Sequence, residues 1–445
     1  MVLCTLMQQQ DNGVLLMTKW QEVKLGDVCL QITDGVHNTV KDDVNGYFYL
    51  LSCKNIKNGT IIIGDNERKI NKTTLDNLRK RTHTAKGDVL LSSVGTIGET
   101  AIIKEDTPLY EFQRSVAIFK PNPQYITSEF LFYSLNNKKK ILQYSAEGAV
   151  QQCLFINPLK EFEISLPPLE MQKKIAGVLG ALDDKIELNN KINNNLEQQA
   201  QALFKSWFVE MKSGLKDEKF GCIPDDAQVC KIGDLPVFIT DYVANGSFAS
   251  LKENVTLYQT RNYAYFIRNT DLKANSFEVY VDEHSYKFLA KSSLFGNEII
   301  ISNVGDVGSV FLCPKLDLPM TLGNNIIMLR ADKDSDLGFY LYVWFKWSYG
   351  QELIQGIKGG SAQPKFNKTD FKGLPVILPP KEQLKKFNKL VTPMFDKISQ
   401  NQQENKQLAA LRDTLLPKLM KGEIDVSNVD ISALTSTDKL SFSGE

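Results

Sequence analysis

A long helical segment occurs twice in this sequence, and the repeat limits the architectures open to it. The stretch LPPLEMQKKIAGVLGALDDKI begins at Leu166 and LPPKEQLKKFNKLVTPMFDKI begins at Leu378, so the pattern recurs after 378 − 166 = 212 residues without a gap. After the first pair of prolines the sequence is polar and aliphatic, with almost no Gly or Pro until about Lys212. Each copy therefore predicts one long helix.

Apolar residues at alternating spacings of four and three predict a heptad seam along each helix, with a polar middle. The seam residues are Leu182, Ile186, Asn189, Asn193 and Leu196 in the first helix and Met394, Ile398, Asn401, Asn405 and Leu408 in the second. Because a buried amide needs a partner, asparagines in both seams favour an antiparallel pair that meets middle to middle. The alternative is two unrelated amphipathic helices, each packed on its own domain.

The repeat extends upstream of the helices. VLLSSVGTIGETAI begins at Val89 and IIISNVGDVGSVFL begins at Ile299, and both read as strand, glycine turn, strand. GAVQQ and GGSAQ precede the two helices at nearly equal distances, and LGDVCLQITDG and IGDLPVFITDY open the two halves. Between these shared motifs the amino-acid sequences of the two halves diverge. We therefore expect a structural framework that repeats and surface segments that differ between the halves.

The predicted fold class is mixed α/β: two globular domains separated by a pair of long antiparallel helices, with an internal pseudo-twofold repeat. The expected regions are an N-terminal extension (1–19), domain 1 (20–168), helix 1 (169–212), a linker (213–227), domain 2 (228–380), helix 2 (381–424) and a polar, disordered C-terminal tail (425–445).

Composition narrows the class of protein. The 445 residues are 42% hydrophobic and 23% charged, which is typical of a globular protein of two or three domains. No apolar run approaches the roughly 18 residues of a membrane span, and the start of the chain lacks a signal-peptide core. The seven cysteines are scattered and form no C-x-x-C pair, which indicates reduced thiols and no zinc site. We expect a cytoplasmic protein.

Net charge argues against a free-standing nucleic-acid binder, because it is formally zero and phosphate neutralisation usually needs a basic excess. Basic runs occur locally, in LRKRTHTAKG with Arg79, Lys80, Arg81 and Lys86 and in NNKKKI with Lys138 to Lys140. Such a run is more often a solvated helix face than a binding patch, so neither run alone indicates DNA binding.

Motifs for catalysis are missing from the sequence. It contains no Gly-Lys dipeptide and hence no Walker A loop, and neither an H-E-x-x-H nor a G-x-S-x-G pattern. His37, His83 and His284 are isolated, which favours surface or turn positions over a general base or metal ligand. The V-G-T-I-G stretch lies between two strand patterns and predicts a hairpin turn with positive φ instead of a phosphate loop.

The doubled order of motifs resembles the specificity (S) subunits of Type I restriction-modification systems. ITDGVHNTV, LLSCKNIKNG, KGDVLLSSVGTIGETAII, ITDYVANGSFASLKENV and both L-P-P-x-E segments carry the resemblance over most of residues 20–424. It implies two target recognition domains, each reading one half of a gapped DNA site. The conserved helices would act as a ruler and dock two methyltransferase (M) subunits.

The resemblance also implies a division of labour. This chain would bind no cofactor and no metal, and S-adenosylmethionine, ATP and Mg²⁺ would be used by the M and restriction (R) subunits. Partners with basic surfaces would also explain the neutral charge. A helix of about 40 residues rises roughly 60 Å, whereas half-sites on one face of B-DNA lie about 34 Å apart, so the helices are long enough for a ruler.

Polar and basic residues where the halves diverge are the candidates for base or phosphate contact, since Arg and Gln can pair bidentately with guanine and adenine. They are His37, Thr39, Lys54, Asn55, Thr96, Gln113 and Arg114 in the first half and Asn245, Ser247, Lys252, Arg261, Arg268 and Asp306 in the second. Unequal halves predict an asymmetric double-stranded DNA target. The heptad count places Trp207 on the seam, so its neighbour Phe208, as an exposed aromatic near the end of helix 1, is the candidate for partner docking.

Two other classes stay open at this stage. One is a coiled-coil scaffold or adaptor that does not read DNA. The other is a DNA methyltransferase or nuclease whose active site has no familiar motif.

Overall fold

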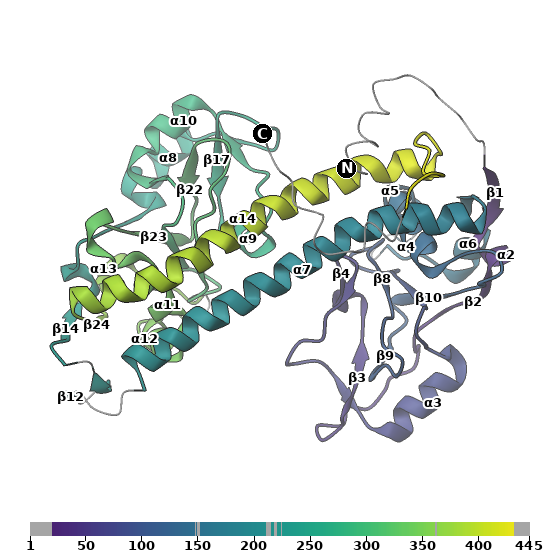
Figure 1. Cartoon of the computed structure of the whole chain (residues 1–445), viewed down its shortest axis with the longest axis horizontal. Helices are drawn as coiled ribbons and strands as arrows, with labels where there is room; N and C mark the ends of the chain where they lie inside the picture. Colours follow the sequence, from purple (N-terminus) through teal and green to yellow (C-terminus); the bar gives the residue numbers. More distant parts are fainter. Residues whose placement is uncertain are drawn as a thin grey trace. The chain divides into compact units, whose positions relative to one another are not determined.

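Two compact units make up the chain in the computed structural model, which describes residues 20–146, 148, 152–210, 215–217, 220–223, 225–360 and 363–430. Unit 1 comprises Met1–Leu188 and Glu404–Glu445, and unit 2 comprises Asn189–Gln403. Two 40-residue helices, α7 (Leu169–Phe208) and α14 (Lys381–Met420), each contribute one part to either unit (Figure 1). Each unit thus contains one αβ domain and a stretch of both long helices.

The domain of unit 1 is built on an antiparallel sheet with the strand order β2-β10-β7-β8. Its strands are β2 (Cys29–Asp34), β10 (Val116–Pro121), β7 (Val89–Ser92) and β8 (Thr100–Ile102). The smaller sheets are β6 (Lys69–Ile70), β3 (Phe48–Leu51) and β9 (Tyr110–Phe112); β1 (Gln21–Lys24) with β11 (Glu163–Leu166); and β4 (Ile56–Lys57) with β5 (Thr60–Ile61). The helices are α2 (Leu25–Val28), η1 (Cys53–Asn55), α3 (Lys72–Thr82), α4 (Ser128–Asn137), α5 (Lys139–Tyr144) and α6 (Ile156–Glu161).

Alternating side chains place β7 between two layers. Val89 and Leu91 belong to the core cluster that also contains residues of α4 and α7, whereas Leu90 belongs to the cluster shared with β9. All three are fully buried. The unbroken apolar run of this strand is explained because a strand covered on both faces shows no polar alternation.

The domain of unit 2 repeats this sheet as β15-β23-β20-β21. Its strands are β15 (Val237–Asp241), β23 (Ile326–Ala331), β20 (Ile299–Ser302) and β21 (Val310–Leu312). The other strands are β16 (Leu257–Tyr258), β18 (Tyr280–Val281), β17 (Ala264–Ile267), β22 (Met320–Leu322) and β19 (Ser293–Leu294) in one sheet, and β14 (Gln228–Lys231) with β24 (Pro375–Leu378). The helices are η2 (Ile232–Asp234), η3 (Tyr242–Asn245), α8 (Phe248–Asn254), α9 (Asn269–Ala274), α10 (Glu283–Phe288), η4 (Ala290–Ser292), η5 (Lys333–Ser335), α11 (Gly338–Lys346), α12 (Ser348–Gly356) and α13 (Lys368–Lys372).

The two domains share one topology, which confirms the predicted repeat. Both four-stranded sheets have the same strand order, and each stands beside a parallel strand pair, β3 with β9 in one domain and β17 with β22 in the other. The domains differ in what flanks that pair: β6 lies beside β3, whereas β18 and β16 lie beside β17 and β19 lies beside β22. The sequence divergence therefore corresponds to different elements around a common framework.

The long helices run antiparallel within each unit, as predicted. In unit 1 the Arg412 Nη1 atom lies 2.7 Å from Asp183 Oδ1, and Lys185 of α7 lies near Glu404 of α14. In unit 2 the Asn401 Nδ2 atom donates a hydrogen bond of 2.8 Å to Asn193 Oδ1.

Several region ends differ from the expectation. The helices end at Phe208 and Met420, four residues earlier than predicted, and the expected linker contains a hairpin of β12 (Leu215–Asp217) and β13 (Gly221–Ile223). In the expected tail, Val426 is fully buried and joins the unit 1 core, because its apolar side chain completes the packing around α14. Residues 1–19 and 431–445 lie outside the described residues. Across the described part of the chain, no helix is long and apolar enough to cross a membrane.

Candidate nucleic-acid interface

A glycine turn joins the paired strands at the same place in each domain. Gly95 and Gly98 have φ of +72° and +91° between β7 and β8, and Gly305 and Gly308 have φ of +76° and +98° between β20 and β21. Glycine adopts this left-handed region at no steric cost. The V-G-x-x-G motif is therefore a turn that projects one residue, Thr96 or Asp306, at its tip, and both tip residues are exposed.

The candidates of domain 1 come from loops that follow different strands. His37 follows β2, Lys54 follows β3, Thr96 follows β7 and Arg114 follows β9. β10 runs antiparallel to both β2 and β7, and β3 runs parallel to β9. The carboxyl ends of these strands consequently lie at one end of the domain, which we call edge 1.

Backbone contacts hold the loops of edge 1 together. Arg114 N donates to Val36 O at 3.0 Å, Gln113 N donates to Leu51 O at 2.8 Å, and Val36 forms a parallel bridge with Gln113. His37, Thr39, Thr96 and Arg114 are exposed on this edge. Residues as far apart in the sequence as His37 and Arg114, 114 − 37 = 77 positions, thus form one polar surface.

Domain 2 forms the corresponding edge 2, with one exception. Asn245 and Ser247 follow β15, Arg268 follows β17 and Asp306 follows β20, so these residues lie at the carboxyl ends of the strands. Arg261 precedes β17, and its Nη2 atom lies 2.5 Å from Asp317, which precedes β22. Arg261 is therefore at the opposite end of the domain from the other candidates. Lys252 is exposed on α8.

Two predicted contact residues have internal roles. The Asn55 side chain is 2% exposed, accepts from Ser52 N at 2.9 Å and donates to Ile62 O at 2.8 Å. The Asn245 amide donates to Tyr242 O and Ser292 Oγ and accepts from Lys291 N. Their polar groups are occupied by the fold: the Asn55 amide closes a local loop, and the Asn245 amide links η3 to a segment 46 and 47 residues away.

Other candidates of domain 2 are held by ionic or capping contacts. Arg268 makes two hydrogen bonds to the buried Asp271 carboxylate at the start of α9, and the Ser247 hydroxyl caps α8. Asp306 lies 2.5 Å from Lys273 Nζ and accepts from Ser309 Oγ at 2.6 Å. The Lys273 hydrogen bond lowers the pKa of Asp306, so the tip of the second turn carries a fixed negative charge.

The basic run of helix α3 divides between two roles. Arg79 pairs with the fully buried Glu111, whose pKa is raised by burial against the opposing effect of its hydrogen bonds. Arg81 instead reaches edge 1, where its Nη1 atom lies 3.2 Å from Asp34 Oδ1. The other carboxylate oxygen, Asp34 Oδ2, lies 2.7 Å from His37 Nε2. Arg81 was not among the predicted contacts, although its basic run marked it in the sequence.

The predicted seam residues lie between the helices to different depths. Leu182, Asn189, Asn401 and Leu408 are buried. The half-buried members are Ile186, Asn193, Leu196, Met394, Ile398 and Asn405.

The structure contradicts the exposed position expected for Phe208. Its side chain is 1% exposed and packs edge-on against Tyr340 and Phe387, whereas Trp207 is only half-buried. Ala200, Phe204 and Phe208 form the buried stripe at this end of α7, with a spacing of four. A straight helix drifts from a strict heptad seam by about 20° per heptad, and helix α11 provides a second surface for the shifted stripe to cover.

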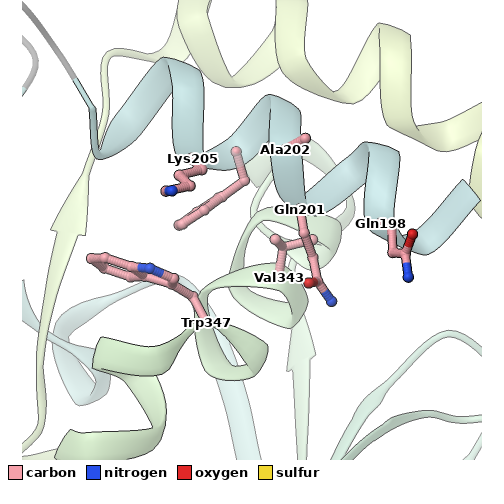
Figure 2. A pocket seen from close by; sticks show the side chains of 7 residues that line it. Gln198, Gln201, Ala202, Lys205, Val343 and Trp347 are labelled. Atoms are coloured by element: carbon pink, nitrogen blue, oxygen red, sulfur yellow. The ribbon is translucent and has the colours of Figure 1, made fainter. Parts of the chain in front are cut away.

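A shallow hollow opens on α7 within unit 2 (Figure 2). Its lining residues are Gln198, Gln201, Ala202, Phe204, Lys205, Val343 and Trp347. Lys205 and Trp347 lie together at one end of it and Gln198 at the other, and Lys205 is paired with Glu210 at 2.8 Å. The hollow brings together no acid, base and nucleophile. Among the residues that the structure describes, no group of His, Cys, Asp and Glu could hold a metal ion.

Comparisons with known proteins agree with this architecture. The family model for the Type I restriction modification DNA specificity domain matches residues 17–198 and 224–410. The Type I restriction enzyme MjaIX specificity subunit of Methanocaldococcus jannaschii is 28% identical over 384 residues, which cover 83% of this chain and 84% of that protein. The HindI specificity subunit of Haemophilus influenzae is 25% identical over 481 residues, which cover 92% of this chain and 100% of that protein.

A solved structure shows the same fold. The crystal structure of a Type I restriction-modification system S subunit from M. genitalium matches with a TM-score of 0.50 and 18% identity, covering 90% of this chain and 96% of that one. Each family match covers one of the two domains that share the four-stranded sheet order, and together the matches span most of the sequence. This chain belongs to the Type I restriction modification DNA specificity family.

Proposed function

We propose that this chain is the sequence-reading subunit of a Type I restriction-modification complex, and that edges 1 and 2 each read one half of an asymmetric bipartite DNA site. The observation that carries the proposal is the repeated topology with different side chains at equivalent edges. Base readout requires side chains that reach base edges, and loops at one end of a rigid sheet are suited to this task.

Methyl transfer and cleavage belong to partner subunits in this proposal. Two M subunits would dock on the helical and domain surfaces and R subunits would join them, and these partners would use S-adenosylmethionine, ATP and Mg²⁺. The match to the DNA specificity domain family and the equivalent edges of the two domains support a recognition role. Basic surface from the partners would supplement the formally neutral charge of this chain.

A DNA selection experiment tests the proposal. The full chain, purified in complex with its M subunit, is mixed with random duplex DNA, and the bound and methylated molecules are sequenced. We expect one motif with two unlike half-sites and a fixed gap. A palindromic motif, or binding without any motif, would contradict the proposal.

Two controls separate the competing classes. A scaffold protein would show no salt-dependent DNA binding, since counterion release makes the affinity of a phosphate-binding protein fall steeply with salt. An enzyme with an unfamiliar active site would transfer methyl groups from S-adenosylmethionine when the purified chain is assayed alone.

A further inference from the structure

Both glycine turns are supported by a glutamine from a neighbouring short helix. Gln143 of α5 donates its Nε2 hydrogen to Ile97 O at 3.0 Å, and Gln355 of α12 donates to Val307 O at 3.1 Å. Ile97 and Val307 occupy the same position of the V-G-x-x-G motif, directly after the tip residue. The same bond therefore occurs in two domains whose surrounding sequences differ.

The residue four positions earlier in each helix makes a second contact with the turn. A Cβ at Gly98 would lie 2.8 Å from Lys139 Cγ, and a Cβ at Gly308 would lie 3.0 Å from Gln351 Oε1. Lys139 also pairs with Glu99 at 2.5 Å, and Gln351 donates to Gly308 O at 3.0 Å. Residues four apart lie on one helix face, so one face of each helix holds its turn at two points.

The glutamines contribute little to the packing of either domain. Both side chains are exposed, whereas the adjacent Leu142 and Ile354 are fully buried and anchor the two helices. The glutamines recur 355 − 143 = 212 residues apart, although their neighbours in KKILQY and QELIQG differ. Because this hydrogen bond is partly exposed, its removal should change the free energy of unfolding only a little. Its recurrence in both domains therefore indicates that it fixes the position of the turn.

We propose that Gln143 and Gln355 are positioning residues that fix the tips of the two turns for DNA reading, each acting on one half-site. The inference rests on the proposed function and adds to it the residues that orient the reading loops. Each glutamine acts through a backbone carbonyl next to the tip, and it needs no contact with DNA. Loss of the bond frees the tip to sample other orientations, which weakens the discrimination between correct and incorrect bases.

The test uses Gln143→Met and Gln355→Met in the full chain bound to its M subunit. Methionine keeps the length of the side chain and removes the donor. The DNA selection described above is repeated with each variant, and the discrimination at every position of the motif is compared with that of the unaltered protein. We expect a loss of roughly fivefold to tenfold confined to one half-site for Gln143→Met and to the other half-site for Gln355→Met.

Matched controls separate positioning from stability. Gln124→Met and Gln259→Met change exposed glutamines in the same two domains, and all four variants should melt within a few degrees of the unaltered protein. Equal losses at both half-sites, or unchanged discrimination in both variants, would overturn the inference while leaving the proposed function in place. An unaltered complex that selects no motif would overturn both.

Discussion

Arg114 is an exposed arginine of edge 1, and its position predicts a direct contribution to DNA binding. It follows β9 beside His37 and Thr96, in a surface formed by loops from several strands. We expect Arg114→Ala to weaken binding of the selected site by about tenfold, because a guanidinium that contacts a base or phosphate is worth roughly 1–3 kcal/mol. Fluorescence anisotropy over a range of salt concentrations measures both the affinity and its salt dependence.

Arg261→Ala provides the matched control for Arg114. Arg261 is exposed and paired with Asp317 at the end of domain 2 opposite to edge 2. Its removal should change DNA affinity by less than about twofold, since the residue lies away from the loops that read DNA. If the two variants weaken binding equally, the assignment of the reading surfaces to edges 1 and 2 is wrong.

Residue type and sequence divergence predicted which segments form edges 1 and 2. They did not predict which polar side chains on those segments are already hydrogen-bonded within the fold. Asn55 and Asn245 have suitable chemistry, yet their amides are bonded to Ile62 O and Ser292 Oγ. The first bond depends on how a local loop folds and the second on the position of a segment 47 residues away. Gln143 and Gln355 show the converse case. Their spacing of 212 residues is visible in the sequence, although only the folded turns reveal what they contact.

At the level of elements, the polar middle of the helix pair gives a quantitative prediction. Asn401 is 1% exposed and donates to Asn193 across the seam. Asn401→Leu should lower the free energy of unfolding by about 1–3 kcal/mol, because the Asn193 amide loses its partner in a half-buried site. Replacing both asparagines by leucine should recover much of this loss, and a double-mutant cycle from urea unfolding measures the coupling.

Asn194→Leu serves as the control for the seam, because Asn194 is exposed on the same helix. Its effect should stay within about 0.5 kcal/mol, as for most surface substitutions. A cycle without coupling between Asn193 and Asn401 would show that their hydrogen bond does not contribute to pairing.

Periodicity predicted that the long helices exist, and the seam asparagines predicted their antiparallel pairing, but the heptad count failed at one end of α7. The heptad count placed Trp207 in the seam and left Phe208 outside, whereas Phe208 is buried against Tyr340. A heptad count assumes a single partner helix. Here α7 also packs against α11, and the identity of this second partner depends on tertiary structure that helix periodicity does not encode.

For the whole molecule, the repeated framework and the divergent loops should determine different properties of DNA recognition. A shared strand order gives both domains a reading edge in the same structural position, and the different loops on those edges should recognise different bases. The helices, which repeat without a gap, should control only the distance between the two half-sites. Spacing and sequence preference should then be separable by mutation.

A change in helix length tests this separation. Four residues inserted after Asn190 add about 6 Å of rise and slightly more than one helical turn, so the seam stays roughly in phase. Four residues inserted after Gln402 lengthen α14 at the matching place, since Asn401 pairs with Asn193 in an antiparallel arrangement. With its M subunit, the doubly lengthened protein should methylate the same two half-sites at a gap longer by about two base pairs, because each step is roughly 3.4 Å.

The single insertions are the control for the double insertion. Either one alone places four unmatched residues in the helix pair and should disturb the pairing of Asn193 with Asn401, which lowers both stability and methylation. The double insertion restores the match, so its folding and its binding to M should resemble those of the unaltered chain. If the doubly lengthened protein folds, binds M and still methylates only the original spacing, the helices do not set the distance between the half-sites.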